Sequence, residues 1–261
     1  MPKYAISVII PALNEEKNVI ASIDNTLAAF DDLSIEGEVI AVDDGSRDAT
    51  PRFIAEKARA DTRIRILTHA RPMGVGACFW DGVDNARYDI VTFIPADNEN
   101  DPWETLRYIG LLEHVDIVIP FAFNKNIRSL LRNIMSFAYL FIINTTFMTS
   151  FNYTNSTVIY RKSVLQQLKH RSKGFLCQTD ILIRATKKGY LFSEVPYRIG
   201  ERKSGKSKLL SFSTFRNGIR DYFILVRDIY IRERKELKKK DFSPDSSTLK
   251  RYMSNAKFKR I

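Results

Sequence analysis

The fold of this chain is decided near its start, where residues 4–15 read YAISVIIPALNE. This apolar run is rich in Ile and Val and ends at a proline, which is typical of a buried parallel strand. Similar short runs recur at residues 38–42, 64–67, 90–94 and 115–119, and segments of helical period separate them. The alternation predicts an α/β fold with a Rossmann-like, mainly parallel sheet. Asn14 is expected to cap a helix that ends at Phe30.

The second half of the chain loses this regular alternation. Residues 127–148 are its most apolar stretch, but Arg132 and several polar residues interrupt it. We therefore expect a buried or membrane-surface helix here and no membrane span. A later apolar stripe has helical spacing and arginines on its other faces, and it comprises Phe212, Phe215, Ile219, Tyr222, Val226 and Ile229. This pattern predicts a basic amphipathic helix.

Charge is distributed unevenly along the chain, which has a formal net charge of +11. Residues 1–200 are balanced, whereas residues 201–261 hold 18 Lys and Arg against 7 Asp and Glu. We expect a catalytic domain over residues 1–210, the basic amphipathic helix over 211–240 and a basic tail over 241–261. A cationic segment of this kind favours an anionic partner such as a membrane surface. Nucleic acid is not expected, because no nucleic-acid-binding motif accompanies the charge.

The two cysteines, Cys78 and Cys177, do not form a recognisable metal or disulfide pattern. They are far apart in sequence, they have no CxxC spacing, and no histidine stands immediately beside them. The sequence therefore predicts neither a disulfide framework nor a zinc knuckle, and it favours the reducing cytoplasm.

Carboxylates gather where the expected strands end. Residues 42–50 read VDDGSRDAT and residues 95–102 read PADNENDP. Ligands of open parallel sheets bind beyond the carboxyl ends of the strands. Adjacent acids at such an edge repel one another unless a divalent cation or a hydrogen-bond donor is shared between them. This edge is therefore the expected ligand site.

These motifs resemble a known family. Residues 7–15 (SVIIPALNE), 42–50 and 96–99 (ADNE) are similar to the N-terminal signatures of family 2 inverting glycosyltransferases. Residues 175–180 (FLCQTD), 194–196 (EVP) and 202–209 (RKSGKSKL) resemble the dolichyl-phosphate mannose synthase branch, which glycosylates polyprenyl phosphates. The resemblance covers about residues 4–230. It implies a GT-A fold, in which a nucleotide-binding half precedes an acceptor-binding half, and a metal-dependent hexosyltransferase activity.

The resemblance also assigns roles to individual residues. Those expected to bind a UDP- or GDP-sugar are Pro11, Leu13, Glu15, Val42, Asp44, Ala96, Asp97, Arg202 and Lys208. The family's metal motif is Asp-x-Asp, and its first acid is absent here. Asp97 matches the second acid and Glu99 a later position, so these two are expected to hold Mg²⁺ or Mn²⁺. Asp97 and Arg202 would stabilise charge on the departing diphosphate.

The acceptor decides whether a general base is required. A polyprenyl phosphate is already anionic and attacks without one, and Arg132 and Ser136 match the family's acceptor-phosphate positions. The protein would then work as a peripheral enzyme at the cytoplasmic face of the membrane. One alternative is transfer to a saccharide hydroxyl in cell-surface polysaccharide synthesis, with Asp180 as base. The other is a catalytically silent nucleotide-sugar-binding or scaffold protein.

Overall fold

The computed structural model describes residues 3–124, 129–174, 176–200 and 212–258. Within them lies one sheet of seven strands in the order β3-β2-β1-β4-β6-β5-β7. The strands are β1 Ala5–Ala12, β2 Glu36–Asp43, β3 Ile64–Thr68, β4 Ile90–Phe93, β5 Ile117–Ala122, β6 Ile159–Arg161 and β7 Phe192–Tyr197. Strand β6 runs antiparallel to β4 and β5, and the other neighbouring pairs are parallel. The predicted mainly parallel sheet is therefore confirmed.

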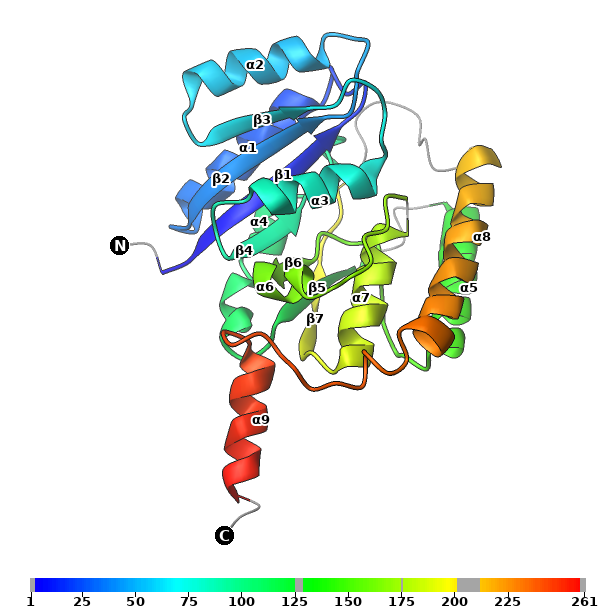
Figure 1. Ribbon diagram of the computed structural model, residues 1–261. Helices are drawn as coiled ribbons and strands as arrows, with labels where there is room; N and C mark the ends of the chain where they lie inside the picture. Colours follow the sequence, from blue (N-terminus) through cyan, green and yellow to red (C-terminus); the bar gives the residue numbers. More distant parts are fainter. Residues whose placement is uncertain (1–2, 125–128, 175, 201–211, 259–261) are drawn as a thin grey trace.

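Helices cover both faces of this sheet (Figure 1). They are α1 Val19–Asp32, α2 Thr50–Ala60, α3 Val75–Asn85, α4 Pro102–Leu106, α5 Leu130–Phe147, α6 Lys162–Gln166, α7 Cys177–Lys188, α8 Phe212–Arg227 and α9 Ser247–Phe258. A 3₁₀ turn, η1, spans Ile109–Glu113, and a π-helical turn, η4, spans Asp228–Arg232.

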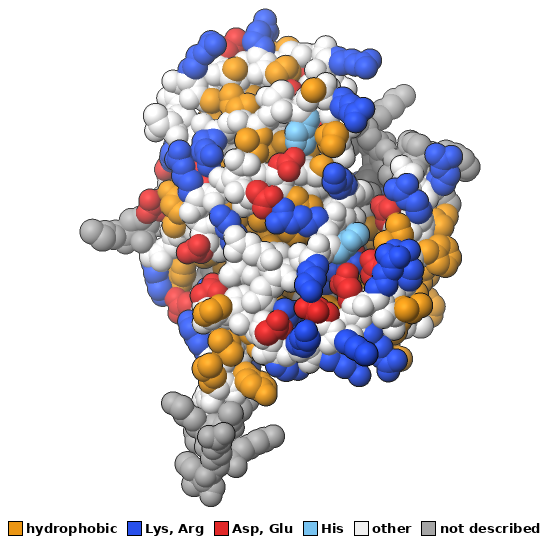
Figure 2. Space-filling model, viewed as in Figure 1, with side chains coloured by type: hydrophobic (Ala, Val, Ile, Leu, Met, Phe, Trp, Pro, Cys, Tyr) orange, Lys and Arg blue, Asp and Glu red, His pale blue; other side chains and the backbone are white. Residues whose placement is uncertain are grey.

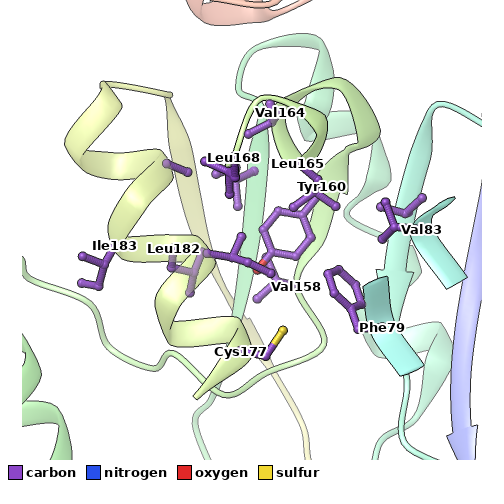
Figure 3. Close-up of a cluster of buried hydrophobic side chains, with 14 of the residues drawn as sticks. Phe79, Val83, Val158, Tyr160, Val164, Leu165, Leu168, Cys177, Leu182 and Ile183 are labelled. Carbon is purple, nitrogen blue, oxygen red and sulfur yellow. The ribbon is translucent and has the colours of Figure 1, made fainter. Parts of the chain in front are cut away.

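The core follows from the alternation of side chains along β1. Ile6, Val8 and Ile10 join one buried cluster with α1, whereas Ile9 joins the cluster on the other face with α3. Helix α3 lies very close to β1, because a Cβ atom added at Gly82 would lie 2.6 Å from a methyl carbon of Ile9. Figure 3 shows part of the α3-side cluster, in which helix α7 and residues 158–168, which include β6 and α6, supply the other labelled side chains.

Two expected helices differ from the structure. Helix α1 begins at Val19, and Asn14 does not cap it. Asn14 instead has a left-handed backbone with φ of 51°, and its N–H donates to Ser46 Oγ at 3.0 Å. The segment before α1 is thus tied to the loop after β2 and cannot continue the helix. The single segment of helical period expected between the apolar runs at residues 90–94 and 115–119 divides into α4 and η1.

The end of the chain folds back onto the domain. Leu237 and Phe242 are buried in the α3-side cluster. The carboxylate of Asp116 accepts the N–H groups of Ser247 at 2.7 Å and Thr248 at 3.0 Å, which are the first residues of α9. Part of the expected basic tail is therefore packed structure, and α9 projects from the body of the molecule (Figure 1).

Candidate functional site

The loops after β1, β2 and β4 meet at one edge of the sheet, because these strands are parallel neighbours. Backbone hydrogen bonds join them: the N–H of Asp44 donates to the Ala12 carbonyl at 2.8 Å, and that of Ala96 donates to the Pro11 carbonyl at 3.4 Å. The N–H of Glu15 donates to Thr50 Oγ1 at 2.9 Å. All three predicted donor-binding motifs therefore lie together, as sequence reasoning required.

Asp44 is a buried anchor for the loop that follows β3. Its two carboxylate oxygens accept the N–H groups of Met73 at 2.7 Å and Gly74 at 2.9 Å. Gly74 has a φ of +97°, a backbone conformation that side chains rarely adopt, and it immediately precedes α3. Val42, at the end of β2 with Asp44, is fully buried. Asp44 therefore fixes the backbone that leads into α3 at this edge of the sheet.

Sequence reasoning missed His69, which lies directly after β3. Its Nδ1 is 2.7 Å from Asp44 and its Nε2 is 2.9 Å from Asp81. Burial lowers the pKa of His69, but the two carboxylates outweigh burial and raise the pKa above its ordinary value. The adjacency of β2 and β3 creates this contact, and no local motif signals it.

Asp97 and Glu99 share one turn after β4. The N–H of Glu99 donates to Asp97 Oδ1 at 3.1 Å, and Asn98 between them has a left-handed φ of 57°. Both acidic side chains are half-buried at the edge where the donor loops meet. Two carboxylates on one turn are an oxygen donor set of the kind that Mg²⁺ and Mn²⁺ use. The residues present thus fit a hard divalent cation.

Arg132 reaches this turn from helix α5. Ser129 caps the start of this helix, because its Oγ accepts the Arg132 N–H at 3.4 Å. The guanidinium Nη2 of Arg132 lies 3.7 Å from Glu99 Oε2. Ser136 follows one turn later and is half-buried. Of the two residues expected to bind the acceptor phosphate, Arg132 therefore lies beside Glu99, one of the residues expected to bind the metal.

Helix α5 leaves a wide apolar face uncovered. Only 11% of helix α5 is buried in the protein. By length and composition alone, the helix is long and apolar enough to cross a membrane. Its exposed large side chains are Leu130, Leu131, Ile134, Met135, Phe137, Phe141 and Ile142, and Met148 follows. Helix α8 packs beside it, with Tyr222 Oη 2.7 Å from Thr146 Oγ1, and adds the exposed Ile219 and Phe223. We call these residues the α5–α8 face.

Asp180, the candidate general base, is bound in a buried ion pair. Its carboxylate oxygens accept from Arg184 Nε at 2.9 Å and Nη2 at 3.1 Å, and Arg184 also contacts Asp228 and Glu233. Burial raises the pKa of Asp180 above its ordinary value although Arg184 opposes the shift. Asp180 lines a pocket of about 360 Å³ between the α3 N-terminus and α8.

The other predicted residues fall into two groups. Pro11 lies near the end of β1, whereas Leu13, Glu15 and Ala96 lie on the loops that meet at the sheet edge, and Ala96 is buried. Arg202 and Lys208 lie outside the described residues, so their expected phosphate contacts remain predictions.

Comparison with known proteins agrees with this arrangement. The chain matches "Glycosyl transferase family 2" over residues 7–169, which is more than half of its length. It is similar in fold to the glucosyl-3-phosphoglycerate synthase of Mycobacterium tuberculosis in complex with Mg²⁺ and UDP, with a TM-score of 0.66 and 20% identity over 86% of this chain and 80% of the other. The architecture is that of a GT-A glycosyltransferase, and the chain belongs to glycosyltransferase family 2.

Relatives with assigned activities include two bacterial enzymes. The chain is 29% identical to the dodecaprenyl-phosphate galacturonate synthase of Rhizobium johnstonii, over 63% of this chain and 50% of the relative. It is 28% identical to the undecaprenyl-phosphate 4-deoxy-4-formamido-L-arabinose transferase of Pseudomonas fluorescens, over 79% of this chain and 61% of the relative. The matched region thus spans half to three fifths of these relatives' lengths.

Proposed function

We propose that this protein transfers a hexose, with inversion, from a UDP- or GDP-sugar to a polyprenyl phosphate at the cytoplasmic face of the membrane. The observation that carries the proposal is the 3.7 Å approach of Arg132 to Glu99. It brings a cation from the most apolar helix beside the carboxylates expected to hold the donor's metal. The names of the two relatives, which specify polyprenyl phosphates, support the same acceptor class.

Asp97 and Glu99 would hold Mg²⁺ or Mn²⁺, which supplies charge neutralisation for the diphosphate that departs. Arg132 would bind the acceptor phosphate, because a guanidinium makes strong charge-assisted hydrogen bonds to phosphate oxygens. Ser136, one turn further along α5, would donate a hydroxyl hydrogen bond to the same group. These contacts would orient an anionic oxygen toward the sugar C1 carbon.

An anionic acceptor also suits the state of Asp180. A sugar hydroxyl must lose its proton during attack and needs a nearby base, whereas a phosphate monoester does not. Both oxygens of Asp180 are engaged by Arg184, so this carboxylate would have to leave a buried ion pair before it could accept a proton. The lipid phosphate is therefore the favoured acceptor over a saccharide hydroxyl.

The α5–α8 face would supply the contact with the membrane. Phe137 and Met148 are 73% and 83% exposed. Exposed apolar side chains that are grouped in one patch mark an interaction site, whereas single scattered ones do not. Ile143 and Phe147 on the opposite side of α5 are buried in the protein. A helix with one face in the protein and one apolar face outside would lie in the membrane interface and would not span the bilayer.

Cations around this face favour anionic lipid. Arg216, Arg220 and Arg227 are exposed on α8, and Arg232, Arg234 and Lys235 follow. Figure 2 shows Lys and Arg side chains beside hydrophobic ones over α8. Each such charge near an anionic surface contributes about 1 kcal/mol. Arg132 on the same helix pair would then lie near the level of lipid phosphates.

The acceptor class can be tested with Asp180→Asn and two acceptors. With polyprenyl phosphate, we expect the variant to keep the shape of the wild-type pH–rate profile, since no base is needed. If the variant loses a titrating limb of that profile, or if wild-type protein glycosylates a saccharide hydroxyl and not the lipid phosphate, the proposed acceptor is wrong. Circular dichroism would verify that the variant is folded.

A further inference from the structure

A second group of side chains with metal-ligating atoms lies beside the loops that follow β2 and β3. Asp44, His69 and Cys78 each present one ligand atom, and these atoms all lie within 4.8 Å of one another. Asp44 follows β2, His69 follows β3, and Cys78 lies in the first turn of α3. His69 Nδ1 is 2.7 Å from Asp44 Oδ1 and 4.0 Å from Cys78 Sγ. Topology thus supplies the histidine that the sequence around Cys78 did not reveal.

The spacing is close to what a tetrahedral cation needs. Zinc bonds of about 2.0 Å to nitrogen or oxygen and 2.3 Å to sulfur place neighbouring ligand atoms about 3.3–3.6 Å apart. The Asp44–His69 separation is shorter than this range and the Cys78–His69 separation is longer. To reach this spacing, the Asp44 and His69 ligand atoms would move apart by about 0.6 Å, and the Cys78 and His69 ligand atoms would approach each other by about 0.5 Å. A fourth position would remain for water.

Asp81 already orients the histidine as an outer partner. Its Oδ2 lies 2.9 Å from His69 Nε2, on the side of the ring away from Asp44 and Cys78. Metal-binding histidines almost always engage a carboxylate or carbonyl in this way, which fixes the ring and its tautomer. Asp81 and Cys78 share one face of α3, because they are three residues apart.

The ligand types select a different class of cation from the one expected at Asp97 and Glu99. Thiolate and imidazole ligands favour Zn²⁺, Co²⁺ and Cd²⁺, whereas a pair of carboxylates favours Mg²⁺ and Mn²⁺. Burial, and then the Asp44 carboxylate, raise the pKa of Cys78 above its ordinary value, so the thiol keeps its proton without a metal. A thiophilic cation would replace that proton, which leaves to solvent.

We propose that Asp44, His69 and Cys78 bind a thiophilic divalent cation of the Zn²⁺ class, and that its binding competes with the donor nucleotide. Competition would follow because Asp44 also holds Met73 and Gly74 in place and is expected to contact the nucleoside. The competition rests on the proposed function, whereas the site itself does not.

Cobalt absorption tests the site without any enzyme assay. Full-length protein freed of metals with a chelator is titrated with Co²⁺, and we expect a near-ultraviolet thiolate-to-cobalt band. Cys78→Ala should abolish the band. Cys177→Ala should keep it, because Cys177 lies in the apolar cluster around Tyr160 and is a matched buried cysteine (Figure 3). Asp81→Asn should weaken Co²⁺ binding about 10- to 100-fold while keeping the band at saturation.

No band in wild-type protein, or an equal band in folded Cys78→Ala, would overturn the site. Competition has its own readout, the KM for the nucleotide-sugar donor at saturating Mn²⁺. Zn²⁺ should raise this KM in wild type and Cys177→Ala but not in Cys78→Ala. If Co²⁺ binds with the thiolate band while Zn²⁺ leaves KM unchanged, the competition is wrong and the site stands. If no donor supports turnover, the proposed function fails and the cobalt result still decides the site.

Discussion

Nη2 of Arg132 lies 3.7 Å from Oε2 of Glu99, and this contact joins helix α5 to the turn that follows β4. Glu99 belongs to the turn after β4, at the edge where the donor loops meet. Arg132 belongs to α5, whose outer side is the α5–α8 face. A charged group arriving along that face would thus reach the donor edge at this pair.

Arg132→Ala should lower kcat/KM for a polyprenyl phosphate about 10- to 100-fold, because a hydrogen bond to a charged group contributes about 1.5–3 kcal/mol. The KM for the nucleotide-sugar should change little. Arg52→Ala is the control, because it removes an exposed arginine of α2, a helix that lies away from the α5–α8 face (Figure 1). Equal losses in both variants would refute a specific role of Arg132 at the acceptor.

Asp97→Ala should abolish turnover and weaken nucleotide binding that depends on Mn²⁺, because a carboxylate ligand of the cation is lost. Asp101→Ala is the control in the same loop. Asp101 caps α4 by accepting the Trp103 N–H at 2.9 Å, so its loss should cost about 1 kcal/mol of stability and leave binding intact. Calorimetric titration with UDP and GDP, with and without Mn²⁺, measures nucleotide binding in both variants. Unchanged binding and kinetics in Asp97→Ala would refute its assignment as a ligand.

Phe141→Asp should reduce co-sedimentation with vesicles that contain anionic lipid, because it places a charge in the middle of the α5–α8 face. Met253→Asp is the matched control, since Met253 is an exposed apolar residue of α9. The secondary structure of both variants should match wild type. If Met253→Asp lowers sedimentation as much as Phe141→Asp does, the α5–α8 face is not the membrane contact.

Arg184→Ala should destabilise the protein by about 3–5 kcal/mol, because it leaves the buried carboxylate of Asp180 without the arginine that pairs with it. Arg63→Ala removes a partly exposed arginine paired with Asp61 and should cost about 1 kcal/mol or less. Chemical denaturation measures both free energies of unfolding. A loss below about 1 kcal/mol in Arg184→Ala would mean that the Asp180 carboxylate is solvated and does not depend on a buried ion pair.

The strands of the fold could be predicted because buried parallel strands are continuous apolar runs with clear ends. The pairing of β6 could not, since its three residues carry no signal of direction. The expected start of α1 at Asn14 was wrong because hydrogen bonds to the loop after β2, distant in sequence, outweighed a good local cap.

Some residues of the candidate site could likewise be predicted from the sequence, and others could not. Motif order along the chain correctly brought Asp44 and Asp97 to one sheet edge. His69 could not be predicted as a site residue, because only the pairing of β2 with β3 brings it close to Asp44. The positive charge of residues 201–261 predicts contact with an anionic membrane but gives no sign that this segment also packs against the domain. Leu237 and Phe242 in this segment are buried in the core. Deleting residues 232–261 would therefore damage packing as well as remove charge.

The most direct test of the account is transfer itself. Full-length protein is incubated with Mn²⁺, vesicles containing undecaprenyl phosphate, and a panel of labelled UDP- and GDP-hexoses. We predict that one donor labels the lipid fraction as a polyprenyl-phosphate hexose of inverted anomeric configuration. Label that never enters the lipid with any donor, or that enters with retained configuration, would contradict the account.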